Sequence, residues 1–135
     1  MTKTTKTTEA NNQPTKFQIK GKEHELKLTF SAIKTLNGSS DGGVYQLIGK
    51  ALMGDIELYG QVVHAGLLHT GEGYSMIDVE EAIDAAFERG DVNMDVVNDT
   101  IQRGVLENPF YKSTVEKLLA NSPEAKSALE TIRGK

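Results

Sequence analysis

The chain of 135 residues contains no cysteine and no tryptophan, and it has only three prolines. The absence of cysteine excludes disulfide bonds and thiolate chemistry, and it is typical of proteins in a reducing compartment. Aromatic residues make up only 6% of the chain, so a core must rest mainly on Leu, Ile, Val and Ala. The N-terminal stretch MTKTTKTTEANNQPT lacks the apolar run of a secretory signal.

The sequence also lacks an apolar run long enough to cross a membrane. Its longest uncharged stretch, Leu58 to Gly71, has fourteen residues, whereas a membrane helix needs roughly 20. A helix in this stretch is apolar almost all round, which predicts a buried, central position in the fold. Gly60 and Gly66 would let neighbouring backbones approach it closely. Because the uncharged run is too short to span a bilayer, we expect no membrane partner.

Positive charge is scarce in the centre of the chain. Residues 41–107 carry three Lys or Arg against thirteen Asp or Glu, a net charge of −10, whereas residues 1–40 carry +4 and residues 108–135 carry +2. An acidic centre repels a phosphate backbone, so we expect no nucleic-acid partner. The simplest interpretation of these acids is a set of solvated helix faces.

The chain divides into a short tail and one domain. Residues 1–14 are rich in Thr, Lys and Asn and predict a disordered tail, and residues 15–135 predict a single domain. Alternating apolar residues in KFQIK and ELKL, with Gly21-Lys22 between them, predict a β-hairpin over residues 16–28. From about residue 29 to 133 the apolar spacing is helical. The predicted fold class is therefore mainly α, with an N-terminal β-hairpin followed by a compact bundle of about six helices.

Capping signals place several helix boundaries. Asp55 and Asn93 stand where helices should begin, and Ser75 with Asp78 has the spacing of a capping box. Gly54 and Gly90 stand where helices should end. The expected buried stripes include Phe30, Ile33 and Leu36 in the first helix, Tyr59, Val62, Val63, Gly66 and Leu67 near the centre, and Val79, Ala82, Ile83, Ala86 and Phe87 in the acidic helix; a last helix is expected within residues 123–133.

No motif in the sequence points to catalysis or to metal binding. His64 and His69 are five residues apart, so they lack the i, i+4 pairing of a zinc-binding helix, and we expect ordinary polar partners for them. DVNMDVVNDTIQ has Val96 where a calcium-binding loop needs glycine. GSSDGG is not followed by the Lys and Ser or Thr of a phosphate-binding loop. We therefore expect no enzyme activity, no metal and no cofactor.

Four blocks of sequence, in this order, carry a resemblance: KGKEHELKLTFSAIKTLNG, GVYQLIGKALMGD, LYGQVVHAGLLH and SMIDVEEAIDAAFERGD. Over roughly residues 16 to 120 the chain resembles the tail assembly chaperones of long-tailed phages and prophages of Gram-positive bacteria. The resemblance implies a small, mostly helical, cytoplasmic protein that is absent from the mature virion. It also implies binding to the tape measure protein and help in recruiting tail tube subunits, in many members through a longer product of programmed ribosomal frameshifting.

We predict the contact residues for the tape measure protein on two helices. The apolar candidates are Tyr59, Val63 and Leu67, for which core packing is the competing interpretation, and the acidic candidates are Glu80, Glu81, Asp84 and Glu88. Arg133-Gly-Lys135 is compatible with slippery codons for a frameshift. A homo-oligomer is left open. The alternative functions are a small helical adaptor or regulatory protein unrelated to phage tails, and an enzyme whose site is formed from scattered residues.

Overall fold

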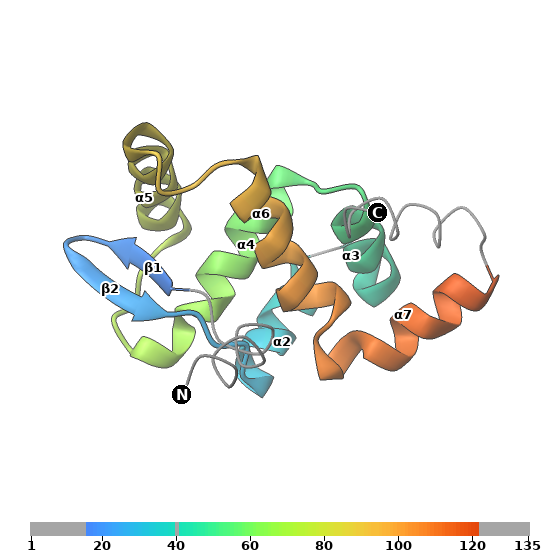
Figure 1. Ribbon diagram of the computed structural model, residues 1–135. Coiled ribbons are helices and arrows are strands. Elements are labelled where there is room, and N and C mark those ends of the chain that lie inside the picture. Colours follow the sequence, from blue (N-terminus) through green and yellow to red (C-terminus); the bar gives the residue numbers. More distant parts are fainter. Residues whose placement is uncertain (1–15, 40, 122–135) are drawn as a thin grey trace, which may run out of the picture.

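A two-stranded hairpin precedes six α-helices in the computed structural model, which describes residues 16–39 and 41–121 (Figure 1). The elements are β1 (Lys16–Ile19), β2 (Lys22–Glu25), α2 (Phe30–Gly38), α3 (Gly43–Leu52), α4 (Ile56–Gly66), α5 (Met76–Arg89), α6 (Met94–Ile101) and α7 (Pro109–Asn121). The predicted fold class, mainly α with an N-terminal hairpin and about six helices, is confirmed. The predicted tail (residues 1–14) and last helix (123–133) lie outside the described residues.

The hairpin is shorter than the sequence predicted, and its turn lies one residue earlier. Ile19 pairs with Lys22, so the two loop residues are Lys20 and Gly21 rather than Gly21 and Lys22. Both have positive φ, at 51° and 78°, as a type I′ turn requires. Pairing with β1 ends at Glu25, and the predicted strand over residues 26–28 is wrong.

Residues 26–28 pack on α4 instead of extending the hairpin. The Lys27 N–H donates to the Gly66 carbonyl at 2.9 Å and satisfies an acceptor at the end of α4. A Cβ at Gly66 would lie 3.0 Å from the Leu26 Cβ and 3.4 Å from its Cα, so the predicted close backbone approach is confirmed at Gly66. At Gly60 the neighbour is a side-chain methyl, the Met76 Cε at 3.1 Å.

The predicted helix starts are confirmed by their capping hydrogen bonds. Asp55 accepts from the Glu57 N–H at 2.8 Å, and Asn93 accepts from the Val96 N–H at 3.0 Å. At the start of α5 the Ser75 hydroxyl accepts from the Asp78 N–H, and the Asp78 carboxylate accepts from the Ser75 N–H, both at 3.0 Å. This reciprocal pair is the capping box that the sequence predicted, and it lowers the pKa of Asp78.

Helix α4 lies at the centre of the fold, as its apolar sequence predicted. It contacts α2, α3, α5 and α6 (Figure 1). Seven of its eleven residues are buried. By contrast, Phe30 was predicted to be buried but is 65% exposed. It stands at the first position of α2, where the Phe110 ring lies 6.3 Å from its ring and Lys34 Nζ lies 5.9 Å from it.

The connection between α6 and α7 is a short π-helix, Gln102–Leu106, which the sequence analysis did not predict. Gly104 lets this segment pack closely against α4, because a Cβ there would lie 3.0 Å from the Val62 side chain. Asn108 then begins α7: its side chain donates to the Gly104 carbonyl and accepts from the Phe110 N–H. This wide turn directs α7 away from α4, towards α3.

Polar contacts fix the hairpin to the segment that joins α4 to α5. His24 Nε2 lies 2.8 Å from the Tyr74 hydroxyl, His69 Nε2 lies 2.6 Å from the Glu25 carbonyl, and Lys22 Nζ lies 3.0 Å from Glu72. The hydrogen bond to Glu72 raises the pKa of Lys22. The hairpin therefore positions the start of α5 against α4.

Candidate partner-binding groove

The three apolar candidates for partner contact belong to the core. Tyr59, Val63 and Leu67 are 2%, 0% and 2% exposed. Burial raises the pKa of Tyr59 to about 12, as expected for a phenol that is excluded from water. Core packing, the competing interpretation, accounts for Val63 and Leu67. Tyr59 is equally buried, but it also lines the groove described below.

The four acidic candidates lie on the exposed side of α5. Glu80, Glu81, Asp84 and Glu88 are all exposed, and they lie within about 100° of the helix circumference, given 3.6 residues per turn. Ile77 lies within the same arc and is 66% exposed. This outer face of α5 is therefore acidic with an exposed apolar side chain near its N-terminal end.

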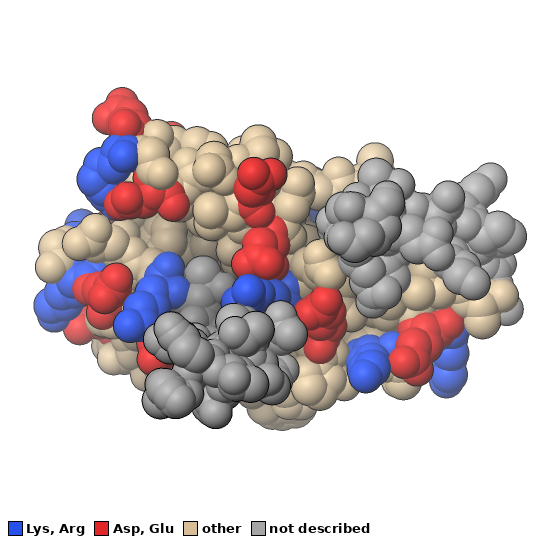
Figure 2. Space-filling view, in the orientation of Figure 1, with Lys and Arg blue, Asp and Glu red and all other residues tan. Residues whose placement is uncertain are grey.

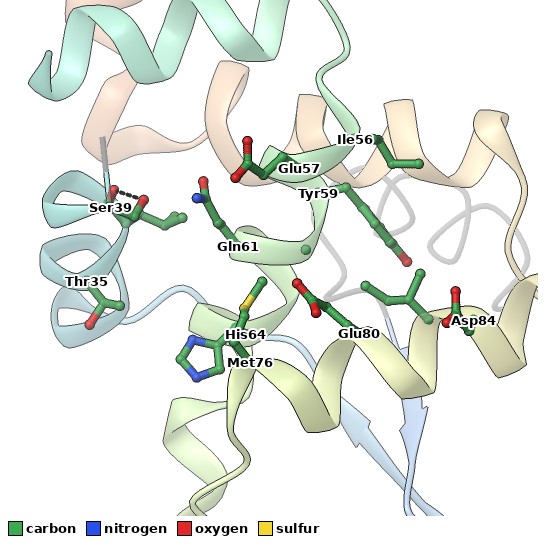
Figure 3. Close-up of a pocket in the computed structure, with 13 residues that line it drawn as sticks. Thr35, Ser39, Ile56, Glu57, Tyr59, Gln61, His64, Met76, Glu80 and Asp84 are labelled. Atoms are coloured by element: carbon green, nitrogen blue, oxygen red, sulfur yellow. Dashed lines mark hydrogen bonds between the residues drawn. The ribbon is translucent and has the colours of Figure 1, made fainter. Parts of the chain in front are cut away.

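A groove of about 590 Å³ lies between α2, α4 and α5, and only two of the four acids line it. Glu80 and Asp84 line it, whereas Glu81 and Glu88 do not. Figure 3 shows residues of α2 facing residues of α5, with residues of α4 between them. The described residues that line it are Thr35, Leu36, Ser39, Ile56, Glu57, Tyr59, Gly60, Gln61, His64, Met76, Glu80, Ile83 and Asp84.

The charged groups among the described residues of the lining are all acidic. Glu57 on α4 joins Glu80 and Asp84 on α5, and neither Lys nor Arg occurs among these described lining residues. Among the described residues, none of these three carboxylates forms an ion pair; the ion pairs found there are Lys20–Asp78, Lys22–Glu72, Arg89–Asp91 and Arg103–Asp99. The groove therefore has a negative potential that its own side chains do not neutralise.

The apolar part of the lining comes from side chains of all three helices. Leu36 is 1% exposed, Met76 and Ile83 are partly buried, and Gly60 has no side chain that could fill the space. Ile56, at the start of α4, is 53% exposed. The lining thus combines apolar surface with acidic groups at its edges, which is the pattern of a site for an amphipathic ligand.

Two polar side chains of α4 also face the groove. His64 Nε2 lies 3.1 Å from the Tyr74 carbonyl, which holds the imidazole in place. The Gln61 Oε1 atom is buried and accepts no hydrogen bond from the described residues. A buried acceptor without a donor is unfavourable, and none of the described residues supplies that donor to Gln61.

The structure places the histidines apart, each with its own polar partner, as the sequence analysis expected. His24 meets the Tyr74 hydroxyl, His64 the Tyr74 carbonyl and His69 the Glu25 carbonyl. Among residues 16–39 and 41–121, no three His, Asp or Glu side chains are grouped so that they could hold a metal ion. The acids of the groove are therefore too dispersed to act as ligands of one cation.

Sequence reasoning did not identify Glu57, Gln61, Met76 or Ile83 as members of this site. Ile83 carried a signal for core packing, and Glu57 resembled any acid in the first turn of a helix. They come together only because α4 and α5 pack side by side, which the helix patterns of the separate segments do not specify.

Charge on the face viewed in Figure 2 is mixed around the hairpin, whereas the side chains over the upper part of α6 are acidic.

Comparison with known proteins identifies the family. Within the described residues no helix has both the length and the hydropathy needed to span a membrane. No curated protein and no solved structure matches the chain. The family model described as "phage tail assembly chaperone protein, TAC" matches residues 16–119, which include every residue of the groove. The chain therefore belongs to the family of phage tail assembly chaperones.

Proposed function

We propose that this chaperone binds the tape measure protein of its phage and helps to recruit tail tube subunits around it. The family match over residues 16–119 carries the proposal, because it assigns the chain to tail assembly. A tape measure protein is expected to be long and helical with exposed apolar stripes. A protein that covers such stripes needs a surface that accepts a helix, and helix-in-groove binding is a recurring way of providing it.

The exposed surface of the chain supports a role in binding proteins. The α2/α4/α5 groove offers apolar lining between acidic edges, and the outer face of α5 continues the acidic surface. Charge complementarity speeds the encounter of such partners and disfavours wrong ones. An acidic chaperone surface would therefore select basic amphipathic segments of a partner from among other helices.

The proposal includes no chemical reaction. The groove contains one imidazole, and that side chain is held by a backbone carbonyl rather than by a carboxylate or a nucleophile. The family is described by assembly and not by a reaction. We propose a non-enzymatic protein that acts in the cytoplasm of a Gram-positive host, is absent from the finished virion, and reaches tail tube subunits through a frameshifted longer form. The family match replaces the alternative of an adaptor unrelated to phage tails.

Co-expression with the tape measure protein of the same genome tests this function. The chaperone should co-purify with it and keep it soluble, whereas the tape measure protein expressed alone should aggregate. A helical protein of similar size and charge, expressed in place of the chaperone, is the control for a general effect of acidity. A tape measure protein that is equally soluble with the control and does not bind the chaperone would contradict the proposal.

Tail tube recruitment is tested separately, with purified tail tube subunits and the preformed complex. The subunits should associate with the complex of chaperone and tape measure protein, and more weakly with either protein alone. Equal association with the tape measure protein in the absence of the chaperone would remove recruitment from the function. The nucleotide sequence of the gene tests the frameshift: codons near its end that cannot slip would contradict a longer product.

A further inference from the structure

The α2/α4/α5 groove has the chemistry of a site for one amphipathic helix. We propose that it binds a helical segment of the partner whose apolar side chains face Leu36, Gly60 and Ile83, and whose Lys or Arg side chains, at positions i and i+4, pair with Glu80 and Asp84. The inference rests on the proposed function for the partner's name only; the groove itself assigns the chemistry of the segment.

The length of the groove matches about two turns of a helix. Its lining on α4 runs from Ile56 to His64, and on α5 from Met76 to Asp84. Each span covers about 12 Å at a rise of 1.5 Å per residue. A docked helix of two turns offers apolar side chains at i, i+3 or i+4, and i+7 on one face, so two or three of them fit along this distance.

The floor of the groove adapts to different apolar side chains. Gly60 has no side chain, and the Met76 Cε methyl packs over it, 3.1 Å from where a Cβ would stand. Methionine is flexible and polarizable, so it adjusts to the shape of a ligand. Ile83, whose Cδ1 lies 3.9 Å from the same point, forms the neighbouring part of the floor.

The arrangement of charge favours a peptide over a metal ion or an anionic ligand. Three carboxylates without basic partners exclude a phosphate or carboxylate ligand, and they do not converge on one point, so a single metal ion would not satisfy them. Glu80 and Asp84 are one turn apart on α5, about 6 Å along the axis. Cations spaced by one turn on a facing helix match this distance, since i and i+4 side chains lie on one face.

Gln61 adds a hydrogen-bonding requirement. Its Oε1 atom has no donor among the described residues, although the residue lines the groove. The backbone N–H groups within a docked helix are already used, so the donor must come from a side chain or from the helix N-terminus. A Lys, Arg, Asn or Gln side chain beside the apolar face of the segment would satisfy the amide after a small rotation.

Two charge-matched double variants of the full chain test the groove. Glu80→Lys with Asp84→Lys reverses the acids that line it, and Glu81→Lys with Glu88→Lys reverses exposed acids of the same helix outside it. The probe is a fluorescent, designed helical peptide with a leucine stripe and Lys at i and i+4, and its counterpart has Glu in place of Lys. Fluorescence anisotropy measures the affinity of each peptide for each protein.

The wild-type chain should bind the Lys peptide and not the Glu peptide. Two reversed ion pairs should weaken binding about tenfold in the groove variant, because two weak exposed pairs are lost and their reversal adds repulsion. The affinity of the variant outside the groove should stay within about twofold of the wild-type affinity, because its reversed charges lie outside the groove and solvent ions screen them from the peptide. Equal losses in the two variants, or equal binding of the two peptides, would overturn the inference, because general acidity would then explain the binding.

A photocrosslinker at the edge of the groove separates this inference from the proposed function. The chain has no cysteine, so Thr35→Cys on α2 introduces one attachment site, and Ser113→Cys, exposed on α7, is the matched control. With co-expressed tape measure protein, the Thr35→Cys label should capture a segment with Lys or Arg at i and i+4 beside an apolar stripe. Co-purification with equal capture from both sites would contradict helix binding in the groove but not the proposed function. Absence of co-purification, together with binding of the Lys peptide, would contradict the proposed function but not helix binding in the groove.

A second copy of this chain is the other occupant that the experiment detects. Light scattering of the wild-type protein should show a mass that does not change with concentration. A dimer that the Glu80→Lys, Asp84→Lys variant dissociates and the Glu81→Lys, Glu88→Lys variant keeps would overturn the proposal, because the groove would then be an interface between copies.

Discussion

Helices α4 and α5 lie side by side but contribute to the protein in different ways. Seven of the eleven residues of α4 are buried, and it contacts four other helices, whereas only Val79 and Ala86 are buried in the fourteen residues of α5. The apolar helix, in which we also predicted partner contacts at Tyr59 and Val63, forms the centre of the core. The acidic helix, whose charges had the ordinary explanation of a solvated face, forms the wall of the groove.

Both helices contribute apolar residues to the groove, but with different degrees of exposure. Tyr59 of α4 is 2% exposed, whereas Ile83 of α5 is only partly buried. We propose that a partner contacts the groove mainly through the more exposed side chains of α5. Substitutions in α4 should therefore act mainly on stability, and substitutions in α5 mainly on binding.

The largest expected effect is on the stability of α4. Leu58→Ala removes a side chain that is 0% exposed and leaves a cavity, which should lower the free energy of unfolding by about 2–5 kcal/mol. Ile77→Ala, at a position of α5 that is 66% exposed, should change it by less than about 0.5 kcal/mol. Urea denaturation followed by circular dichroism measures both. Similar losses for the two variants would contradict the division of roles.

The next largest effect is a loss of stability in alkali. Burial raises the pKa of Tyr59 and Tyr111 to about 12, above the value of about 10 in an unfolded chain. The folded protein therefore holds these protons more tightly, and this stabilisation is complete below pH 10 and lost as pH rises through 12. Each tyrosine contributes at most about 1.4 kcal/mol per pH unit to the slope.

Tyrosine-to-phenylalanine variants measure that slope. Tyr59→Phe keeps the buried ring and should make the free energy of unfolding fall less steeply between pH 10 and 12. Tyr111→Phe should do the same, with an additional loss at neutral pH because the Tyr111 hydroxyl donates to the Asn37 side chain at 2.9 Å. A slope equal to that of the wild type in both variants would show that neither phenol titrates on unfolding.

The capping box of α5 gives a smaller effect. Ser75→Ala removes the acceptor of the Asp78 N–H and should cost about 1 kcal/mol. Because the same residues begin the helix that carries Glu80 and Asp84, amide hydrogen exchange should increase in the first turn of α5 and stay unchanged in α4. Ser113→Ala, at an exposed position of α7, is the control. Faster exchange along the whole of α4 would contradict the independence of the two helices.

The smallest expected effect on stability comes from a substitution at Gly60, on the floor of the groove between α4 and α5. Gly60→Ala favours the helical conformation of α4 by up to about 1 kcal/mol, and the added methyl displaces the flexible end of Met76. Stability should be equal to that of the wild type or slightly higher, while affinity for the Lys peptide should fall. A loss of stability of more than about 1 kcal/mol would show that Met76 is fixed in place, which contradicts an adaptable floor.

Much of the fold could be predicted because local rules decide it. Asp55, Ser75 and Asn93 begin helices through side-chain hydrogen bonds that span at most three residues. Apolar spacing placed α4 in the centre for the same reason, since a helix without a polar face must be covered. The hairpin was predicted one residue out of register, because nothing local distinguishes Lys20-Gly21 from Gly21-Lys22 as the loop.

The groove could be predicted only in part, because it depends on contacts between distant segments. The sequence identified Glu80 and Asp84 as acids of an outer face but could not separate them from Glu81 and Glu88. That separation follows from the packing of α5 on α4. Gln61 became notable only when its amide oxygen proved to be buried without a donor. The π-helix at Gln102–Leu106 was missed as well, and the close contact of Gly104 with α4 within it is again a contact between distant segments.

We propose that binding resides in the acids that line the groove and not in acidity at large. The ratio of dissociation constants for the tape measure protein between the two double variants of α5, measured at one salt concentration, distinguishes the two. We expect the variant at positions 80 and 84 to bind about tenfold more weakly than the variant at positions 81 and 88. A ratio close to one would show that the position of the acids does not matter.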